Sequence, residues 1–218
     1  MQKQLLIGVI TGIFLFGGVV GASANLITNG SFEDSTVTAN GGKWQQFSSI
    51  NVNGWSNADD TEIQTEMLFG PAADGYQYVE LDSKINDGND WLAQTFSTEI
   101  GQEYIFSFAF SPRPGVANNT LWAGVITYDP EVDWLTFDSP YADGSNMNGT
   151  NWTYYTYSFV AKWTSSTVAF KDGGPDDSYG TFIDDVSVTA APVPEPATML
   201  LFGTGLAGLA GFARRKKK

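Results

Sequence analysis

The stretch Thr181-Phe182-Ile183-Asp184-Asp185-Val186-Ser187-Val188-Thr189 decides the fold class. Successive side chains of a strand point to opposite faces of a sheet, and the alternation here is typical of a half-buried β-strand. Phe182, Val186 and Val188 share one parity, which we assign to the core. Asp184 has the same parity, so its carboxylate is expected to turn inward, where a buried charge requires a partner.

Similar short segments recur through the middle of the chain, with Gly, Pro, Asn or Asp between them, and none shows convincing helical periodicity. Aromatic and β-branched residues fill these segments. The pattern predicts an all-β chain with a single β-sandwich domain over residues 25–191. The predicted strands are 61–67, 76–81, 91–96, 104–110, 121–128, 134–137, 152–161, 167–170 and 181–189.

Composition excludes several kinds of chemistry. The chain has no histidine and no cysteine, so a Ser-His-Asp relay, an imidazole zinc site, a thiol nucleophile and a disulfide are impossible. Carboxylate pairs for glycoside hydrolysis and oxygen ligands for a hard cation remain. Without its two ends the chain has 5 basic and 23 acidic residues, a net charge of −18. We therefore expect no nucleic acid partner.

The N-terminal residues 1–24 have the pattern of a secretory signal peptide. Lys3 gives a positive start, residues 5–20 are apolar, and Ala22-Ser23-Ala24 is a small-residue cleavage pattern. Cleavage would begin the mature chain at Asn25 after export by the Sec pathway. An uncleaved anchor is the alternative.

The C-terminal residues 192–218 combine Pro194-Glu195-Pro196, the apolar run 199–213 and a basic end at 214–218. About 16 apolar residues make a helix of ~24 Å, which just spans the hydrocarbon of a membrane. The order resembles the PEP-CTERM sorting signal of Gram-negative bacteria. That resemblance implies an exosortase that removes the tail, a transient anchor in the inner membrane, and a cell-surface or extracellular destination. A plain single-span tail anchor is the alternative.

A carboxylate partner for Asp184 is available in the opening segment Asn29-Gly30-Ser31-Phe32-Glu33. If the first and last strands are neighbours, Glu33 and Asp184 can share a cation, and calcium accepts carboxylates together with backbone carbonyls. Alternatively, Asp184 accepts hydrogen bonds from backbone or hydroxyl groups, as buried polar groups usually do.

Strands 76–82 and 61–67 each place carboxylates on one side, and the first of them adds tyrosines. If these sides align, rings and carboxylates line one face, as in sugar recognition. An ordinary solvated sheet face is the alternative. Arg113, held between two prolines, either pairs with an acid such as Asp82 or Glu80 or donates to a ligand. The candidate glycan face comprises Glu62, Tyr76, Tyr78, Glu80, Asp82, Arg113 and Trp152.

Several segments, in order, resemble the galactose-binding-like jelly rolls of carbohydrate-binding modules and DUF642-type extracellular proteins. They are 29–33, 54–56, 75–83, 111–115, 151–153 and 182–186. The resemblance implies a jelly-roll β-sandwich, and the opening and closing motifs often hold a structural calcium in similar modules, which supports Glu33 and Asp184.

Three functions follow for such a chain. The leading hypothesis is an exported, non-catalytic sandwich that binds or organises extracellular polysaccharide. A structural or adhesion protein of the matrix, without specific sugar binding, is the second. A carboxylate glycosidase or lyase is the third, for which Glu62 and Glu80 are the candidate pair.

Overall fold

A computed structural model describes residues 23–48, 51–57, 60–84, 90–127, 134–136 and 140–192, together with 203–206, 209 and 212. The chain divides into two compact units, of which Ser23–Val193 is one and the two chain ends form the other. In the terminal unit the described residues are helical. Most of the predicted signal peptide and the Pro194-Glu195-Pro196 motif lie outside the described residues. Within the described part of the chain, we find no helix with the length and apolar character needed to cross a membrane.

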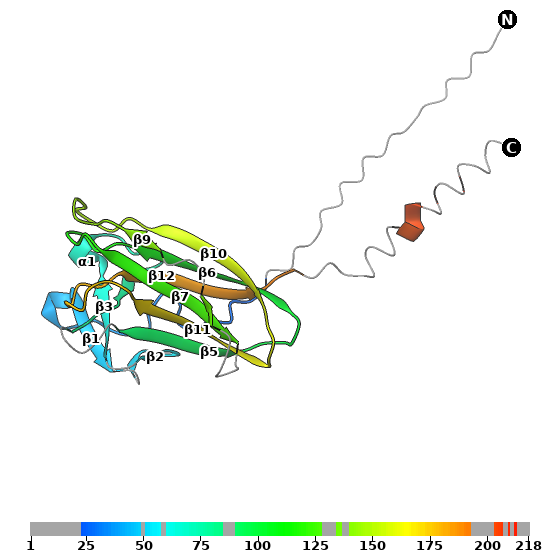
Figure 1. The fold of residues 1–218 in the computed structure, drawn as a ribbon, viewed down its shortest axis with the longest axis horizontal. Helices are drawn as coiled ribbons and strands as arrows, with labels where there is room; N and C mark the ends of the chain where they lie inside the picture. The colour runs from blue at the N-terminus through cyan, green and yellow to red at the C-terminus, as the bar shows by residue number, and fades with distance from the viewer. Residues whose placement is uncertain are drawn as a thin grey trace, which may run out of the picture. The chain divides into compact units, whose positions relative to one another are not determined.

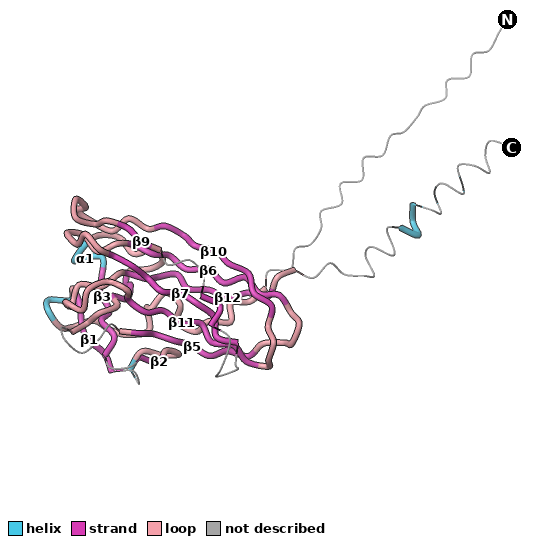
Figure 2. The backbone as a smooth tube through the Cα atoms, viewed as in Figure 1, coloured by secondary structure: helices cyan, strands magenta, loops and turns pink. Residues whose placement is uncertain are grey.

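Residues 23–193 form two sheets, as Figures 1 and 2 show, and the described strand pairings are antiparallel. The first sheet has the order β1 (Trp44–Ser48), β3 (Asp60–Thr65), β4 (Gln77–Glu80), β12 (Phe182–Ala190), β6 (Glu103–Ser111) and β10 (Thr153–Val160). The second has the order β2 (Ser56–Asn57), β5 (Trp91–Ser97), β11 (Ser165–Asp172), β7 (Asn119–Thr127) and β8 (Trp134–Thr136), and β9 (Tyr141–Ala142) also pairs with β7.

The core lies between the two sheets and is rich in aromatic rings. On β6, Phe106, Phe108 and Phe110 alternate along the strand and are buried. The rings of Phe106 and Phe108 lie 5.8 and 5.1 Å from the ring of Phe170 on β11, in the opposite sheet. These contacts join the sheets, and the predicted β-sandwich is confirmed.

The last strand is buried as expected, and Val186 and Val188 lie in the core as predicted. The predicted face was wrong for Phe182 and Asp184. A register shift falls between Asp184 and Ser187, and Asp185 has a φ of 46°. Such a bulge adds a residue and changes which side the following residues face. Ile183 and, beyond the bulge, Val186 belong to the core, whereas Phe182 and Asp184 face the outer side of the first sheet.

Sequence reasoning also missed short elements. Three strands of the sandwich were not predicted: β1, which has a polar sequence, and β2 and β9, which have two residues each. The predicted strand 61–67 ends early, because the chain turns after Thr65 into the one-turn helix α1 (Glu66–Phe69). A 3-10 turn, η1 (Asn40–Gly42), precedes β1. These local turns have too few residues to show a hydrophobic period.

Candidate functional site

Two predicted carboxylates do align on the outer side of the first sheet. Glu62 on β3 is paired in register with Glu80 on β4, and Gln64 is paired with Tyr78. The side-chain amide of Gln64 donates to Glu62 Oε1 at 2.9 Å and also to Glu80 Oε2. The alternation of these two strands therefore predicted the right neighbours.

The aromatic part of the predicted face forms a buried cluster. Tyr78 has no exposed surface, and its ring lies 5.0 Å from that of Phe182 and 5.5 Å from that of Trp152. Trp152 is anchored by its indole N–H, which donates to the carbonyl of Pro71 at 2.8 Å. The loop around Pro71 and helix α1 thus cover this part of the sheet, and Tyr78 cannot stack on a ligand here.

Arg113 forms a salt bridge with Glu80, one of the two alternatives that the sequence left open. Its guanidinium lies 4.8 Å from the ring centre of Tyr179 and 5.2 Å from that of Phe69. Glu80 is only 1% exposed and also accepts the N–H of Gly180 at 3.0 Å. A carboxylate bound on several sides in this way does not face an open cleft, so the geometry gives no support to Glu62 and Glu80 as a glycosidase pair.

Asp82 and Tyr76 lie apart from this cluster. Asp82 leaves the strand with a φ of 81° and is fully buried, where its Oδ2 accepts the N–H groups of Asp177 (3.0 Å) and Ser178 (2.8 Å). Burial raises the pKa of Asp82 to about 6, against the opposing effect of these two bonds. Tyr76 is exposed before β4 begins. Neither residue extends the predicted glycan face.

A small pocket remains open beside the pair Glu62 and Arg113. We call it the Glu62 pocket; its volume is about 230 Å³, and it is lined by Trp44, Gln46, Glu62, Leu68, Ser83, Arg113, Ser178 and Tyr179. Two members of the predicted glycan face therefore meet in one pocket, together with aromatic side chains that sequence reasoning did not assign to it.

The predicted calcium ligands bind backbone N–H groups of one segment. Glu33 Oε1 accepts the N–H of Tyr76 (2.7 Å) and that of Gln77 (2.6 Å). Asp184 Oδ2 accepts the N–H of Ala73 (2.8 Å) and that of Asp74 (2.9 Å). This is the hydrogen-bonded alternative for Asp184.

Glu33 Oε1 and Asp184 Oδ2 each already accept two N–H bonds, which uses the lone pairs that a cation would need at these two oxygens. Among the described residues, no group of three or more acidic side chains is arranged to hold a metal ion. Burial raises the pKa of Asp184 to about 8, despite the three N–H groups that bind its carboxylate. Calcium between Glu33 and Asp184 stays a prediction that this geometry does not support.

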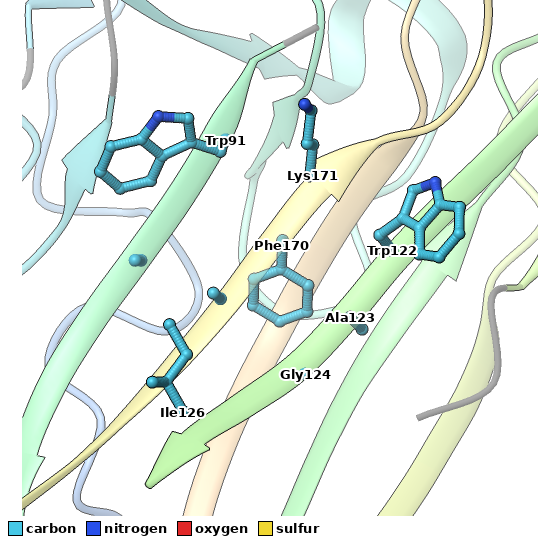
Figure 3. A pocket seen from close by; sticks show the side chains of 9 residues that line it. Trp91, Trp122, Ala123, Gly124, Ile126, Phe170 and Lys171 are labelled. Atoms are coloured by element: carbon cyan, nitrogen blue, oxygen red, sulfur yellow. The ribbon is translucent and has the colours of Figure 1, made fainter. Parts of the chain in front are cut away.

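A second open feature lies on the second sheet and was missed by sequence reasoning. A trough of about 560 Å³ crosses the outer side of β5, β11 and β7, and Figure 3 shows its lining side chains. Trp91 on β5 is 39% exposed and Trp122 on β7 is 49% exposed. Lys171 on β11 is paired in register with both tryptophans, so the three side chains form one row across the strands.

The next row along the strands makes the floor of the trough. It consists of Ala93, Ala169 and Gly124, again in register across the three strands. These residues are small, so the two indoles rise above them. Neighbouring strands are ~4.8 Å apart, which places the backbones of Trp91 and Trp122 ~10 Å apart. The trough can therefore hold a flat, elongated ligand that lies across the strands.

A glycine supports one of the two indoles. A Cβ atom on Gly173, just after β11, would lie 2.4 Å from the indole nitrogen of Trp122. Strand parity held a signal for this row, because Trp91 and Trp122 alternate with the buried residues Leu92 and Leu121. The sequence alone did not show which of the seven tryptophans are exposed.

The comparisons with known proteins agree with this architecture. The family described as protein of unknown function DUF642 matches residues 25–189, and the PEP-CTERM protein-sorting motif matches residues 192–217. The sorting motif indicates export and membrane-associated sorting in a Gram-negative bacterium, with processing by an exosortase. No protein of curated function matches the chain.

Solved structures share the fold at low identity. A Stig cyclase from Fischerella sp. TAU is 15% identical with a TM-score of 0.58, and the match covers 79% of this chain and 100% of the cyclase. An arabinose-bound α-L-arabinofuranosidase is 15% identical with a TM-score of 0.51, covering 81% and 28% respectively. A xylan-binding domain from Paenibacillus barcinonensis is 13% identical with a TM-score of 0.45, and the match covers 79% of this chain and 98% of that domain.

Proposed function

This chain belongs to the DUF642 family, and from that premise we propose that it is an exported, non-catalytic protein that binds polysaccharide through the trough on its second sheet. The observation that carries the proposal is the row of Trp91, Lys171 and Trp122 above a floor of small residues. The PEP-CTERM motif supports a destination outside the cytoplasm, at the cell surface or in the extracellular matrix.

The chemistry of the row suits a sugar chain. An indole offers a flat apolar face on which the C–H face of a sugar ring can stack, and its amphipathic character makes exposure tolerable. Lys171 adds an ammonium group that donates hydrogen bonds to hydroxyl oxygens. The two indoles lie in one row on alternate strands, so two sugar units of one chain can stack at the same time. An apolar trough on a strongly acidic protein is itself typical of a binding site.

Binding without catalysis is supported by the state of the carboxylates. Glu80 is tied to Arg113 and Gln64, away from the trough. The described lining of the trough has no acidic side chain that could protonate a leaving group or act as a nucleophile. The polysaccharide is therefore proposed to leave the trough unchanged.

The test is binding of the purified domain, residues 25–193, to a panel of polysaccharides by affinity gel electrophoresis. We expect Trp91→Ala and Trp122→Ala each to weaken retention by ~10- to 100-fold, since an aromatic anchor of a site contributes ~1.4–2.8 kcal/mol. Trp163→Ala is the matched control, because Trp163 is also 49% exposed but lies outside the trough.

Gly173→Ala provides a second variant that leaves both tryptophans in place. The new methyl group displaces the Trp122 indole. Retention on the polysaccharide should therefore fall, while the tryptophan fluorescence spectrum should still be that of a folded protein. Equal retention of the Trp122 and Trp163 variants, or no retention of the wild type on any polysaccharide, would contradict the proposal and favour a purely structural role.

A further inference from the structure

The Glu62 pocket lies on the first sheet and is separate from the trough on the second. It is smaller than the ~300–1,000 Å³ of sites for drug-sized ligands, so it suits a single small group or one sugar ring. Trp44 from β1 and Tyr179 from the loop before β12 provide aromatic side chains in its lining, and Glu62 from β3 provides a carboxylate that is only 8% exposed.

Two acceptor oxygens on β3 receive no hydrogen bond from the described residues. The Gln64 amide nitrogen donates to both Glu62 and Glu80, which fixes the orientation of the amide. As a result, the buried Gln64 Oε1 has no hydrogen-bond partner. The second oxygen of Glu62 also accepts no hydrogen bond from the described residues. Glu62 lines the pocket, so a ligand there can donate an N–H or O–H group to its second oxygen.

The charges of the region are unbalanced in the same direction. Glu62 and Glu80 share the charge of Arg113, which forms its salt bridge with Glu80, so one of the two negative charges is left over. Burial raises the pKa of Glu62, and the nearby Asp90 adds to the effect, while the Gln64 bond and Arg113 oppose it. A cation beside the carboxylate would remove the cost of keeping it ionised.

We propose that the Glu62 pocket binds a protonated primary amine carried on a sugar ring. The ammonium donates to the free oxygen of Glu62 in a charge-assisted bond, and the aromatic side chains of Trp44 and Tyr179 in the lining suit a sugar ring. The excess of 23 acidic over 5 basic residues between the two chain ends attracts a polycation in solution.

The choice of a sugar ring as the carrier of the amine rests on the proposed polysaccharide binding. The preference for an ammonium group does not, because it follows from the acceptors and charge of the Glu62 pocket alone. An amino sugar that has lost its acetyl group meets both conditions, and its acetylated form is uncharged and lacks two of the three donors on nitrogen.

The test compares three probes by isothermal titration on residues 25–193: glucosamine oligomers, N-acetylglucosamine oligomers of the same length, and Nα-acetyl-lysine amide. We expect the glucosamine oligomer to bind at least about tenfold more tightly than the other two. Glu62→Gln keeps the shape and the bond to Gln64 but removes the charge, so it should abolish the preference. Glu103→Gln, at an exposed carboxylate elsewhere, should preserve it.

Two further variants separate this site from the trough and from effects on folding. Trp122→Ala should leave the glucosamine preference unchanged, and Trp44→Ala should reduce it while the protein stays folded by circular dichroism. Equal affinity for the acetylated and free oligomers overturns the proposal. So does a Glu62→Gln protein that keeps the preference, or a lysine amide that binds as well as the amino sugar. In each of these outcomes the Trp122 and Trp163 comparison still decides the proposed function by itself.

Discussion

Replacement of Arg113 by methionine tests the buried charges on the outer side of the first sheet. The change removes the guanidinium from Glu80, which is 1% exposed and keeps only the Gly180 N–H and the Gln64 amide as partners. Loss of one member of a buried ion pair costs ~3–5 kcal/mol because the other charge is left uncompensated. Three ring contacts of the guanidinium are lost as well, so we expect a loss near the upper end of that range.

The measurement is urea unfolding at pH 7, followed by tryptophan fluorescence, for wild type, Arg113→Met, Glu80→Gln and the double variant. The double variant should recover more than half of the loss, since it replaces both charges together. Arg113→Lys should fall between wild type and Arg113→Met, because lysine keeps the charge but not the planar fork. A loss below ~1 kcal/mol in Arg113→Met, or a double variant as unstable as the single one, would refute the buried-pair reasoning.

Two further stability predictions concern a tightly packed glycine and a buried carboxylate. Gly180→Ala places a Cβ atom 1.0 Å from the carbonyl oxygen of Leu81, so we expect the unfolding midpoint to fall sharply or the protein not to fold. Gly101→Ala, which meets nothing within 4 Å, should lose only ~1 kcal/mol from its positive φ; similar losses in the two variants would contradict the packing. Burial raises the pKa of Asp172 to about 6, so the folded protein holds this proton longer than the unfolded chain does. As the pH rises from 4 to 6, the free energy of unfolding should therefore fall by up to ~3 kcal/mol because of this group, and above pH 6 this contribution should stay constant. Asp172→Asn should reduce that fall. If the urea midpoint of Asp172→Asn depends on pH as strongly as that of the wild type, the raised pKa of Asp172 is not the cause.

The β-sandwich was predictable because alternation survives in most of its long strands. Glu62 and Glu80 were placed correctly on one side, since side-chain parity within β3 and β4 is regular. The burial of Tyr78 was not predictable from the sequence, because it depends on a contact with Trp152, which lies in a loop far from Tyr78 along the chain. Parity cannot say which outer face of a sandwich is covered by loops and which is open.

The exposed tryptophans on the second sheet also could not be identified from side-chain parity alone. Trp91 and Trp122 have outward parity in the sequence, but their meeting in one row depends on the register that β11 sets between β5 and β7. Register follows from long-range pairing, and the segments between these strands vary in length. The positive φ of Asp185, which changes the parity of the last strand, likewise has no signal in hydrophobicity.

The bulge at Asp185 divides β12 into two halves that make different contacts. Before Asp185, the half with Phe182 and Asp184 fastens the segment 69–74 onto the outer side of the sheet. After it, Val186 and Val188 fill the space between the sheets. A substitution of Val186 or Val188 therefore weakens the whole domain, whereas one of Asp184 can loosen a surface loop and leave the sandwich intact. The loop that covers the outer side of β12 can therefore change without a change in the core that keeps the protein folded.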